Sequence, residues 1–511
     1  MKIQGDGPRS PLEGQIVATT GVVTALRADG RGFWIQDPDG DAKLETSDGI
    51  LIWTERRAAP GERVRVEGVV AEFEREGGLS LTQIVDVETL EVLSSGHDLP
   101  PLPLPPVPDS SIADAIRHWA RLEGMLVALD SALVVGPTTR FGEVVVVQHE
   151  QAGEGNHVFV RALGDGDVDY NPERIVIDDA IAAAPEARPG DVIRALVGVV
   201  DYSFGNYKLQ ARQLVHVVGA RTQERPRAPG GLAVASFNVE NLFEAPGEAL
   251  ESKLDELTRF IMQALLVPEI LVVQEVENEV VLRALGERIN TAAGTRYRAR
   301  GLGSSDGRGI ENAFLYDAAR VRLNDAFLLS GADVEAAFGP NSVSPGREPL
   351  VGKFEIGGAE LVIVGNHFKS KGGDDPLFGA RQPFQRPTER QRKAQARAVR
   401  RYVDELLAED PGHLILVAGD LNDFPFSEPG EGSDHPLGIL EGEDDSLTNL
   451  VAALPSPYTF VFEGNAQVLD HLLVSASLGE LVLGAEIVHG NADDPTRASD
   501  HDPPVVRLRL P

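Results

Sequence analysis

The strongest chemical signal in the sequence is an aspartate and an asparagine, two residues apart, at the end of an apolar run. Asp420 and Asn422 lie within residues 417–425, and residues 414–418 before them are apolar and β-prone. Because strand side chains alternate between faces, both should emerge on the same side at the end of a buried strand. A carboxylate beside a carboxamide in that place can orient and deprotonate a water. The pair therefore indicates a metal-dependent hydrolase.

Polar side chains recur at the ends of other apolar runs in the same part of the chain. In chain order these further positions are Asn238 with Glu240, Glu275, His367, Asp470, and Asp500 with His501. Ligands of α/β domains bind outside the strand ends, so these positions could converge on one site.

Each of these residues also has a purely structural explanation. Glu275 could be a strand-end carboxylate that meets solvent, Asn238 could bond neighbouring backbone, and His367 could be a satisfied core histidine. Asp500 stands in a sequence typical of turns. His471 follows Asp470 and should point to the opposite face, so we treat it as structural. The coincidence of six positions in chain order is what favours a site.

The elements that would position these residues alternate between strands and helices over 232–511, which predicts a mixed α/β domain with two sheets or one large one. We expect strands over 232–240, 270–276, 312–316, 350–355, 360–367 and 414–421, a hairpin through Gly464-Asn465, and strands ending at 473, 488 and 508. Helices are expected over 248–266, 279–293 and 388–409. The capping box Thr388-x-x-Gln391 should start the last helix.

Two mainly-β segments precede this domain. In residues 1–98, five short alternating strands (14–26, 32–36, 49–52, 63–73 and 79–93) predict a small barrel of the OB type. Residues 109–221 contain a helix at 112–122 and strands at 124–127, 143–147, 158–162, 192–201 and 207–217, and could form a second such barrel. Basic and aromatic residues are not interleaved along these segments. We therefore favour a packing or spacing role over the binding of single strands.

Two linkers separate the three segments. Residues 99–108 are rich in proline and should form a semi-rigid spacer, and the polar segment 222–231 reads as a second boundary.

Composition limits the classes of function. At 511 residues the chain is too long for one core, and the absence of cysteine excludes disulfides, thiolate metal sites and cysteine nucleophiles. Any metal must bind oxygen or imidazole. The net charge of −32 would repel nucleic acid at long range. This repulsion argues against a protein that binds nucleic acid tightly.

Composition also bears on the setting of the protein. The sequence contains neither an apolar run of membrane-spanning length nor a signal peptide, which predicts either a cytoplasmic protein or an exported one whose signal has been removed. The excess of acid and the eight lysines among 47 basic residues suit an extracellular setting or a GC-rich genome.

The motifs over 232–511, in their order and spacing, resemble the DNase-I-like endonuclease/exonuclease/phosphatase superfamily. The motif Asn-His-Phe-Lys-Ser-Lys and the N-terminal barrels are similar to those of the bacterial extracellular nuclease branch, in which an OB-like domain comes first. The resemblance implies a four-layer α/β sandwich preceded by two small mainly-β domains.

The resemblance also implies a metal site. Glu275 would bind Mg²⁺ or Mn²⁺, with Ca²⁺ as a further possibility, and Asn238 would lie near the metal. Asp500 would be a further metal or hydrogen-bonding ligand. Glu240 is a weaker candidate, since the extracellular branch often has an apolar residue there. Glu311 would partner the first histidine of the site.

The catalytic roles follow from the same resemblance. Asp420 would deprotonate the attacking water with help from Asn422. His501, polarised by Asp470, would contact the scissile phosphate. His367 would contact the phosphate or protonate the leaving oxygen. Phosphodiester hydrolysis needs such a nucleophile, charge neutralisation and a proton for the departing oxygen.

One local feature favours nucleic acid as the substrate. Residues 366–402 contain ten basic residues and three acidic ones, a balance of +7. Lys369 and Lys371 are the first candidates for phosphate contacts and Arg390 a weaker one, although the helical part of this island could simply be a solvated face. We expect a monomeric, exported, metal-dependent endonuclease acting on DNA or also on RNA. The alternatives are a phosphatase or phospholipid phosphodiesterase on the same site, and a catalytically dead binding or adhesion protein.

Overall fold

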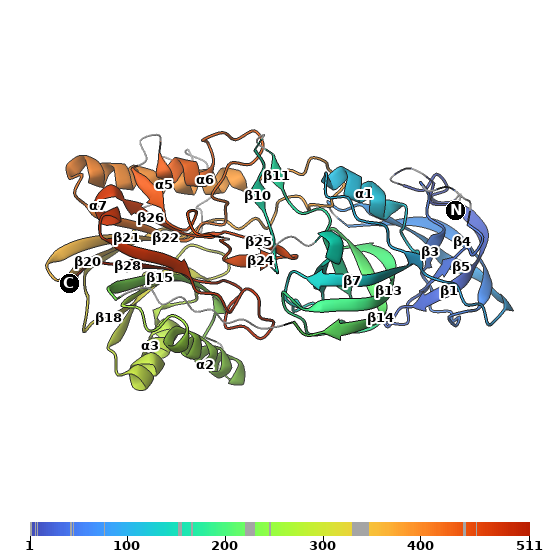
Figure 1. Cartoon of the computed structure of the whole chain (residues 1–511), viewed down its shortest axis with the longest axis horizontal. Helices are drawn as coiled ribbons and strands as arrows, with labels where there is room; N and C mark the ends of the chain where they lie inside the picture. The colour runs from blue at the N-terminus through green and yellow to red at the C-terminus, as the bar shows by residue number, and fades with distance from the viewer. Residues whose placement is uncertain are drawn as a thin grey trace.

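The computed structural model describes residues 3–510 except 6, 8, 41, 42, 44, 76, 152–155, 165, 166, 220–229, 245, 246, 330–346, 443–445 and 456. The expected linker 222–231 therefore lies almost wholly outside the described residues. Three domains follow one another along the molecule, with the N-terminal barrel at one end and the C-terminal α/β domain at the other (Figure 1).

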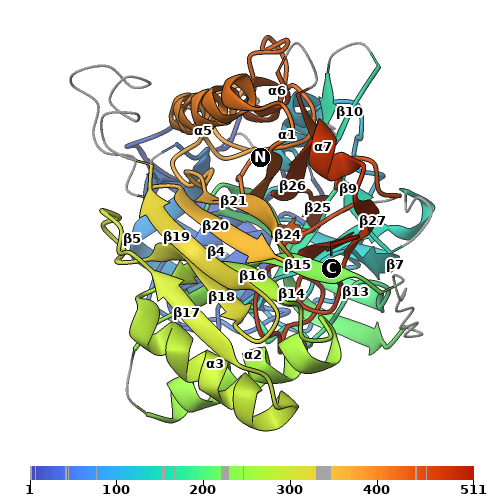
Figure 2. The ribbon, with the colours of Figure 1, turned by 90° about the vertical axis from the view of Figure 1, so that its left-hand side faces the viewer.

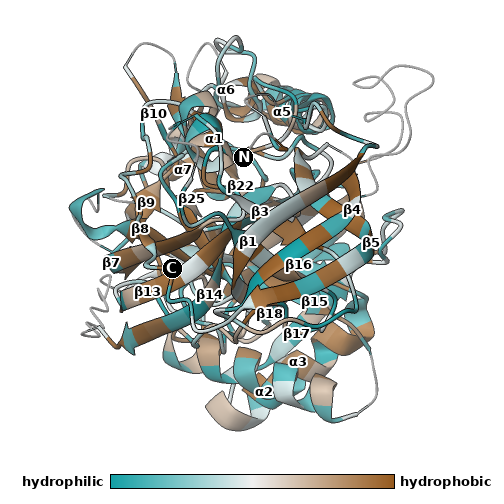
Figure 3. Ribbon diagram, turned by 90° about the vertical axis from the view of Figure 1, so that its right-hand side faces the viewer, coloured by the Kyte–Doolittle hydropathy of each residue, from teal (hydrophilic) through white to brown (hydrophobic). Residues whose placement is uncertain are grey.

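The first domain is a closed five-stranded barrel with the strand order β1-β2-β3-β5-β4. Its strands are β1 (Ile16–Leu26), β2 (Phe33–Gln36), β3 (Gly49–Ile52), β4 (Arg63–Glu74) and β5 (Ser80–Ser94). Buried and more exposed residues alternate along the first part of β4. Figure 3 shows the corresponding bands of hydrophobic and hydrophilic colour on this strand. Such alternation places one face of each strand against the apolar interior of a barrel. The predicted small barrel is confirmed, and its assignment to the OB type stays a prediction.

The second domain repeats the connectivity of the first. Its strands form the ring β7-β8-β12-β14-β13, which closes through a pairing of β13 with β7. Strands β12 and β14 pair in parallel, as β3 and β5 do in the first domain. Its elements are β6 (Leu102–Pro103), α1 (Ile112–Ala120), β7 (Leu126–Val134), β8 (Val144–Gln148), η1 (His149–Gln151), β9 (Val158–Phe159), β10 (Arg161–Ala162), β11 (Val168–Asp169), β12 (Ile175–Asp178), β13 (Val192–Ser203) and β14 (Asn206–Val217).

The proline-rich segment between the barrels, expected to be a semi-rigid spacer, packs against the second domain. Leu102 and Pro103 pair in parallel with β7, and the Leu104 amide donates to the Ala128 carbonyl. Leu104 and Val107 are buried against the second domain. Burial of these apolar side chains stabilises the segment against the barrel. Proline is tolerated there because the segment forms an edge strand.

The C-terminal domain contains two six-stranded sheets, ordered β17-β18-β16-β15-β28-β27 and β19-β20-β21-β22-β26-β23. The strands are β15 (Leu232–Leu242), β16 (Ile270–Val276), β17 (Tyr297–Gly301), β18 (Glu311–Asp317), β19 (Arg322–Leu328), β20 (Leu350–Ile356), β21 (Ala359–His367), β22 (Leu414–Asp420), β23 (Leu447–Asn449), β26 (Asp470–Ser475), β27 (Val482–Ile487) and β28 (Pro504–Leu508), with the hairpin strands β24 (Phe460–Phe462) and β25 (Asn465–Gln467). The helices are α2 (Glu248–Gln263), α3 (Glu279–Ala293), α5 (Glu389–Glu409), α6 (Pro436–Glu441) and α7 (Ala476–Gly479).

These elements stack in four layers. Figure 2 shows α2 and α3 below the two sheets and α5 and α6 above them. One apolar cluster fills the space between the sheets, and one lies between each sheet and its helices. The predicted α/β sandwich is confirmed.

Two local expectations in this domain differ from the structure. The Thr388 side chain makes no capping bond; it bonds Asp374 (2.7 Å) and accepts from Arg392 (2.7 Å) instead. Strands β17, β19 and β23 and helices α6 and α7 were not expected, because each is short or lacks a clear apolar period.

The second and third domains are joined by hydrogen bonds between backbones. Strand β9 of the second domain pairs with β25, so it forms one small sheet with the β24–β25 hairpin. Side chains reinforce the junction, including Asn171 to Asn465 (2.7 Å) and His157 to Asp493 (2.9 Å). Within the described ranges, no helix combines the length and the apolar character needed to cross a membrane.

Candidate active site

The polar strand-end residues come together where the two sheets of the C-terminal domain face each other. In one sheet, parallel pairing of β15 and β16 places Asn238 opposite Gln274, next to Glu275. In the other, the register aligns His367 with Asp420 and Asp420 with Asp470. The Asn238 amide donates to Asp420 (3.1 Å) and to Glu275 (3.4 Å), which links the sheets directly above their cores.

The backbone is kinked at these positions. Glu240, Asn241, Glu275 and Asn422 all have φ between 50° and 63°, a region that non-glycine residues rarely adopt. Simple alternation therefore does not hold here, although we used it to place Asn422 beside Asp420 and Glu240 beside Asn238. Strained residues of this kind persist only where the surrounding structure holds them, and they concentrate at functional sites.

Asn422 is positioned by a turn beyond the end of β22. Its amide N–H donates to the Asp420 carboxylate (3.0 Å), and its side chain donates to the Phe368 carbonyl (3.2 Å). Asn422 thus fixes one oxygen of Asp420 through its backbone. Asn238 fixes the other oxygen through its side chain.

Asp420 is buried and has the electrostatics of a base. Burial raises the pKa of Asp420 to about 7; His501 opposes this rise and Asp470 adds to it. A carboxylate with a pKa near neutrality accepts a proton from water more readily than an ordinary aspartate.

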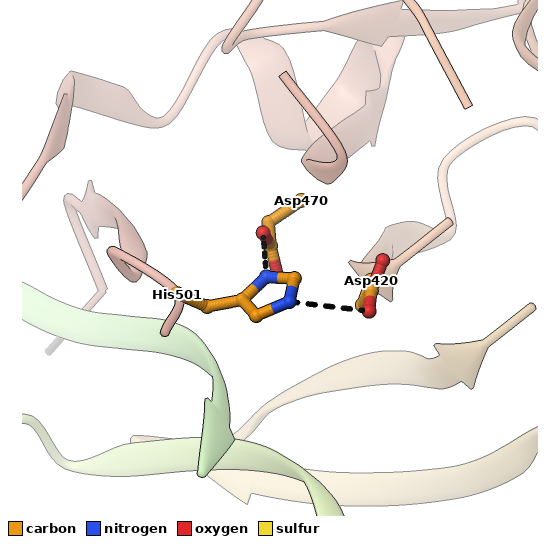
Figure 4. A group of neighbouring side chains, drawn as sticks. All are labelled: Asp420, Asp470 and His501. Carbon is orange, nitrogen blue, oxygen red and sulfur yellow. Dashed lines mark hydrogen bonds and ion pairs between the residues drawn. The ribbon is translucent and has the colours of Figure 1, made fainter. Parts of the chain in front are cut away.

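His501 and Asp470 form a buried pair beside Asp420 (Figure 4). The His501 Nδ1 lies 2.7 Å from the Asp470 carboxylate, and its Nε2 lies 3.8 Å from Asp420. Burial by itself would lower the pKa of His501, but Asp470 and Asp420 outweigh it and raise the pKa well above the ordinary value. The protonated form of the ring is therefore favoured. Phe460 stacks on it at 4.7 Å between ring centres.

His367 has the opposite protonation state. Arg347 donates to its Nε2 (2.7 Å) and is itself held by Asp306 (3.0 Å). Burial, and after it Arg347, lowers the pKa of His367 well below the ordinary value. The neutral form of the ring is therefore favoured. The two roles expected for His367, contact with the phosphate or protonation of the leaving oxygen, stay predictions.

Glu311 does not partner His367 as expected. It begins β18 and accepts from the backbone N–H of Gly303. A Cβ on Gly301 would come within 2.1 Å of its carboxylate, so the side chain lies packed against this loop. The described contacts of His367 are with Arg347 and, more distantly, Asp420 and Glu275.

The donor set fits a hard divalent cation. Glu275, Asp420, Asp470 and Asp500 supply carboxylates and Asn238 a carboxamide, the ligands that Mg²⁺ and Mn²⁺ prefer. Among the described contacts, the buried Asp470 Oδ1 has no hydrogen-bond partner. A cation nearby would compensate this oxygen.

One compact group in the site also has the spacing of a metal cluster. Ligand atoms of Asp420, Asp470 and His501 all lie within 4.8 Å of one another. The protonated ring of His501, which the raised pKa favours, has no lone pair to offer a metal. Any cation would therefore be held by the oxygen ligands, and His501 would remain a catalytic side chain.

Glu240 and Asp500 lie at the outer edge of the site. Glu240 is 3.9 Å from Arg497, and burial together with Asp500 raises the pKa of Glu240. The Oε1 atom of Glu275 faces Asn238 in the site. Its Oε2 atom accepts from Arg308 (3.1 Å) and from the backbone N–H of Asn241 (3.1 Å).

The basic island of residues 366–402 is largely neutralised by acids from the loop after β22. Arg392 is fully buried and donates to Asp423 (2.7 Å), and Arg386 pairs with Glu428 and with Glu431 (3.3 Å). These acids lie 30 to 45 positions further along the chain. A local charge count therefore overstates the free positive charge.

The three basic residues expected to contact phosphate have different surroundings. Lys369 donates to two backbone carbonyl oxygens of its own loop. Lys371 lies 3.6 Å from Asp423 and 4.0 Å from the ring centre of Phe424. Arg390 is exposed on α5. Their contact with a substrate phosphate stays a prediction.

Residues 246–484 match the family model described as the endonuclease/exonuclease/phosphatase family. The matched residues lie within the C-terminal domain. Residues 110–221 match a model described as a domain of unknown function. Among curated proteins, none is similar enough to this chain to count as a match.

Several solved structures are similar to about half of the chain. The endonuclease/exonuclease/phosphatase from Bacteroides vulgatus is 19% identical, with 55% of this chain and 100% of that chain covered and a TM-score of 0.39. The human nocturnin catalytic domain with bound sulfate is 15% identical, with 55% and 95% covered and a TM-score of 0.38. The mannosyl-6-phosphatase of Bacteroides thetaiotaomicron is 19% identical, with 54% and 99% covered and a TM-score of 0.37.

Four residues of the C-terminal domain contact the site but were missed from the sequence: Arg308, Arg347, Phe460 and Arg497. Arg347 and Arg497 lie outside the helices and strands, and Arg308 lies in a turn. None of them ends an apolar run, which is the signal that identified the other residues. Phe460 belongs to the expected hairpin, but nothing local indicated that its ring would meet a histidine.

Proposed function

We propose that the chain is a divalent-metal-dependent phosphodiesterase that hydrolyses nucleic acid, acting as an exported endonuclease. The family of the C-terminal domain supports a phosphoesterase. The observation that carries the proposal is Asp420, a buried carboxylate with a pKa near 7, flanked by the imidazolium of His501.

Asp420 would remove the proton of the attacking water. Asn238 and the Asn422 backbone hold both carboxylate oxygens, so the group does not need to reorganise before it reacts. Such general-base catalysis contributes roughly 10²- to 10⁴-fold in rate.

His501 would stabilise negative charge on the phosphate. Asp470 fixes the ring orientation and keeps it protonated, so Nε2–H is the group left to donate. A bound Mg²⁺ or Mn²⁺, held by Glu275 with Asn238 and Asp500, would add positive charge at the phosphate oxygens.

The decisive experiment is a plasmid-nicking assay with Mg²⁺, Mn²⁺, Ca²⁺ or EDTA, with bis(p-nitrophenyl) phosphate as a small phosphodiester in parallel. We expect wild-type protein to cleave both substrates with Mg²⁺ or Mn²⁺ and neither in EDTA. Asp420→Asn, which keeps the shape of the side chain, should lower kcat by at least about 100-fold.

Other outcomes would redirect the proposal. Intact DNA and RNA together with rapid hydrolysis of a phosphomonoester or a lipid headgroup would favour the phosphatase or phospholipid alternative. No hydrolysis with any metal would leave the binding-protein alternative. Cleavage of DNA by Asp420→Asn at the wild-type rate would rule out Asp420 as the base.

A further inference from the structure

The exposed aromatic side chains of the molecule gather in one place. A cavity of about 1190 Å³ lies where the three domains meet. Every exposed phenylalanine and tryptophan among the described residues lines it: Trp53, Phe73, Phe141, Phe204 and Phe462. Exposed aromatic rings are costly in water, so their concentration in one cavity calls for a ligand with flat apolar faces.

Arginine side chains lie over these rings. Arg75 is 4.0 Å from the ring centre of Phe204, and Arg140 is 4.9 Å from that of Phe141. Within the described ranges, neither arginine has an ion pair with a carboxylate. Arg140 and Phe141 are neighbours in the sequence, but Arg75 and Phe204 are far apart and meet only in the fold. Cationic and aromatic groups of the barrels thus lie together, contrary to our expectation.

The rings lead to the catalytic residues. Phe462 stacks beside Phe460 (6.3 Å), and Phe460 stacks on His501 (4.7 Å). Glu275 and Asp500 line the same cavity. Figure 1 shows β24 and β25, which carry this hairpin, pointing from the catalytic domain toward the second barrel.

The charge of the walls decides which kind of strand fits. Nine carboxylates and six cationic side chains line the cavity, and several of the cations are paired, as Lys208 is with Glu143 and Asp178. A duplex presents phosphates and hides its bases, so it would meet net repulsion here. An unpaired strand presents base faces, which stack on aromatic rings at roughly 1–3 kcal/mol per base.

We propose that this cavity is a base-stacking site for an unpaired stretch of the substrate strand next to the scissile phosphate. The proposal rests on the proposed nuclease function and names its substrate: single-stranded nucleic acid or an unpaired end. The two barrels are then substrate-binding domains, and rings rather than a basic groove supply most of the affinity.

The test is direct binding in EDTA, measured by fluorescence anisotropy of labelled dodecamers. The ligands are a dT12 strand, an abasic dodecamer with the same phosphates, and a 12-base-pair duplex. We expect dT12 to bind at least about fivefold more tightly than either, because only dT12 offers accessible bases. Since few phosphates are contacted, log Kd should change with log salt by a slope of less than about 3.

Variants locate the site on the protein. Phe204→Ala and Phe141→Ala should each weaken dT12 binding by about fivefold or more, and Phe204→Trp should retain it. Val280→Ala removes an exposed apolar side chain on α3, outside the cavity, and serves as the control. Thermal unfolding of each variant checks that the fold is kept.

The outcomes separate this proposal from the proposed function. If bis(p-nitrophenyl) phosphate is hydrolysed but dT12 binds no better than abasic strand or duplex, the base-stacking site is wrong and the phosphodiesterase stands. The site is also wrong if the Phe204 and Phe141 variants bind dT12 like wild type. If base-dependent binding is lost in the variants but no phosphodiester is hydrolysed, the binding site stands and the catalytic proposal fails.

Discussion

The two histidines of the site illustrate how neighbours divide chemical roles between identical side chains. Both are buried, but Asp470 raises the pKa of His501 and favours its protonated form, whereas burial and Arg347 lower the pKa of His367 and favour its neutral form. The sequence predicted both as site residues. It could not predict their protonation, because the deciding partners, Arg347 above all, lie in loops of no regular pattern.

The two candidate metal ligands Glu275 and Glu240 can be separated by calorimetric titration with Mn²⁺. Glu275→Gln should weaken binding by at least about tenfold, since a unit charge about 4 Å away is worth on the order of 4 kcal/mol in a partly buried site. Glu240→Gln should change it by less than about threefold, because its carboxylate faces Arg497. Equal losses in the two variants would contradict the assignment of Glu275 as the ligand.

At the scale of elements, the kinks that end β15, β16 and β22 matter as much as the strands themselves. The apolar runs of 270–276, 360–367 and 414–421 were identified from the sequence to within a residue, because buried strands leave a clear pattern. The directions of Glu240 and Asn422 were not, because their positive φ breaks the alternation that sequence reasoning assumes. The free positive charge of residues 366–402 was overestimated for a related reason: the acidic partners come from a loop that is distant in the sequence.

Gly419 is the position where strand geometry bears most directly on the site. It has φ of 150°, and a Cβ there would lie 2.0 Å from the Asn366 carbonyl on the neighbouring strand. Gly419→Ala should therefore destabilise the domain by at least about 2 kcal/mol and lower kcat by displacing Asp420.

Urea unfolding and phosphodiester hydrolysis measure these two effects of Gly419→Ala. The control is Gly484→Ala in β27, where nothing lies within 4 Å of the added Cβ. Similar effects of the two substitutions would show that close packing at Gly419 is not the cause.

At the scale of the whole molecule, the domains are locked together by buried polar contacts. Glu123 is buried between the two barrels and accepts from Gln4 (3.1 Å) and the Thr82 amide (3.3 Å). Burial raises the pKa of Glu123 to about 8. The acid is therefore protonated in the fold at neutral pH, and in the unfolded chain it is ionised.

This raised pKa has a definite sign for stability. The contribution of Glu123 is fully present below its unfolded pKa of about 4.5 and is lost as pH rises toward 8. Glu123→Gln imitates the protonated acid, so its advantage over wild type in urea unfolding should grow between pH 4.5 and 8, by on the order of 3 kcal/mol. Glu88→Gln on the exposed part of β5 controls for the lost charge. An advantage that does not grow with pH would contradict the assignment.

The pairing of β9 with β25 has a consequence for the order in which the protein is made. Residues 158–159 leave the ribosome about 300 residues before 465–467, and domains fold from the N-terminus as they are synthesised. The edge on which the hairpin will pair is thus present before the hairpin exists. Asp470 and His501 follow the hairpin in the sequence, so they join the candidate site only after both strands of this junction have been made.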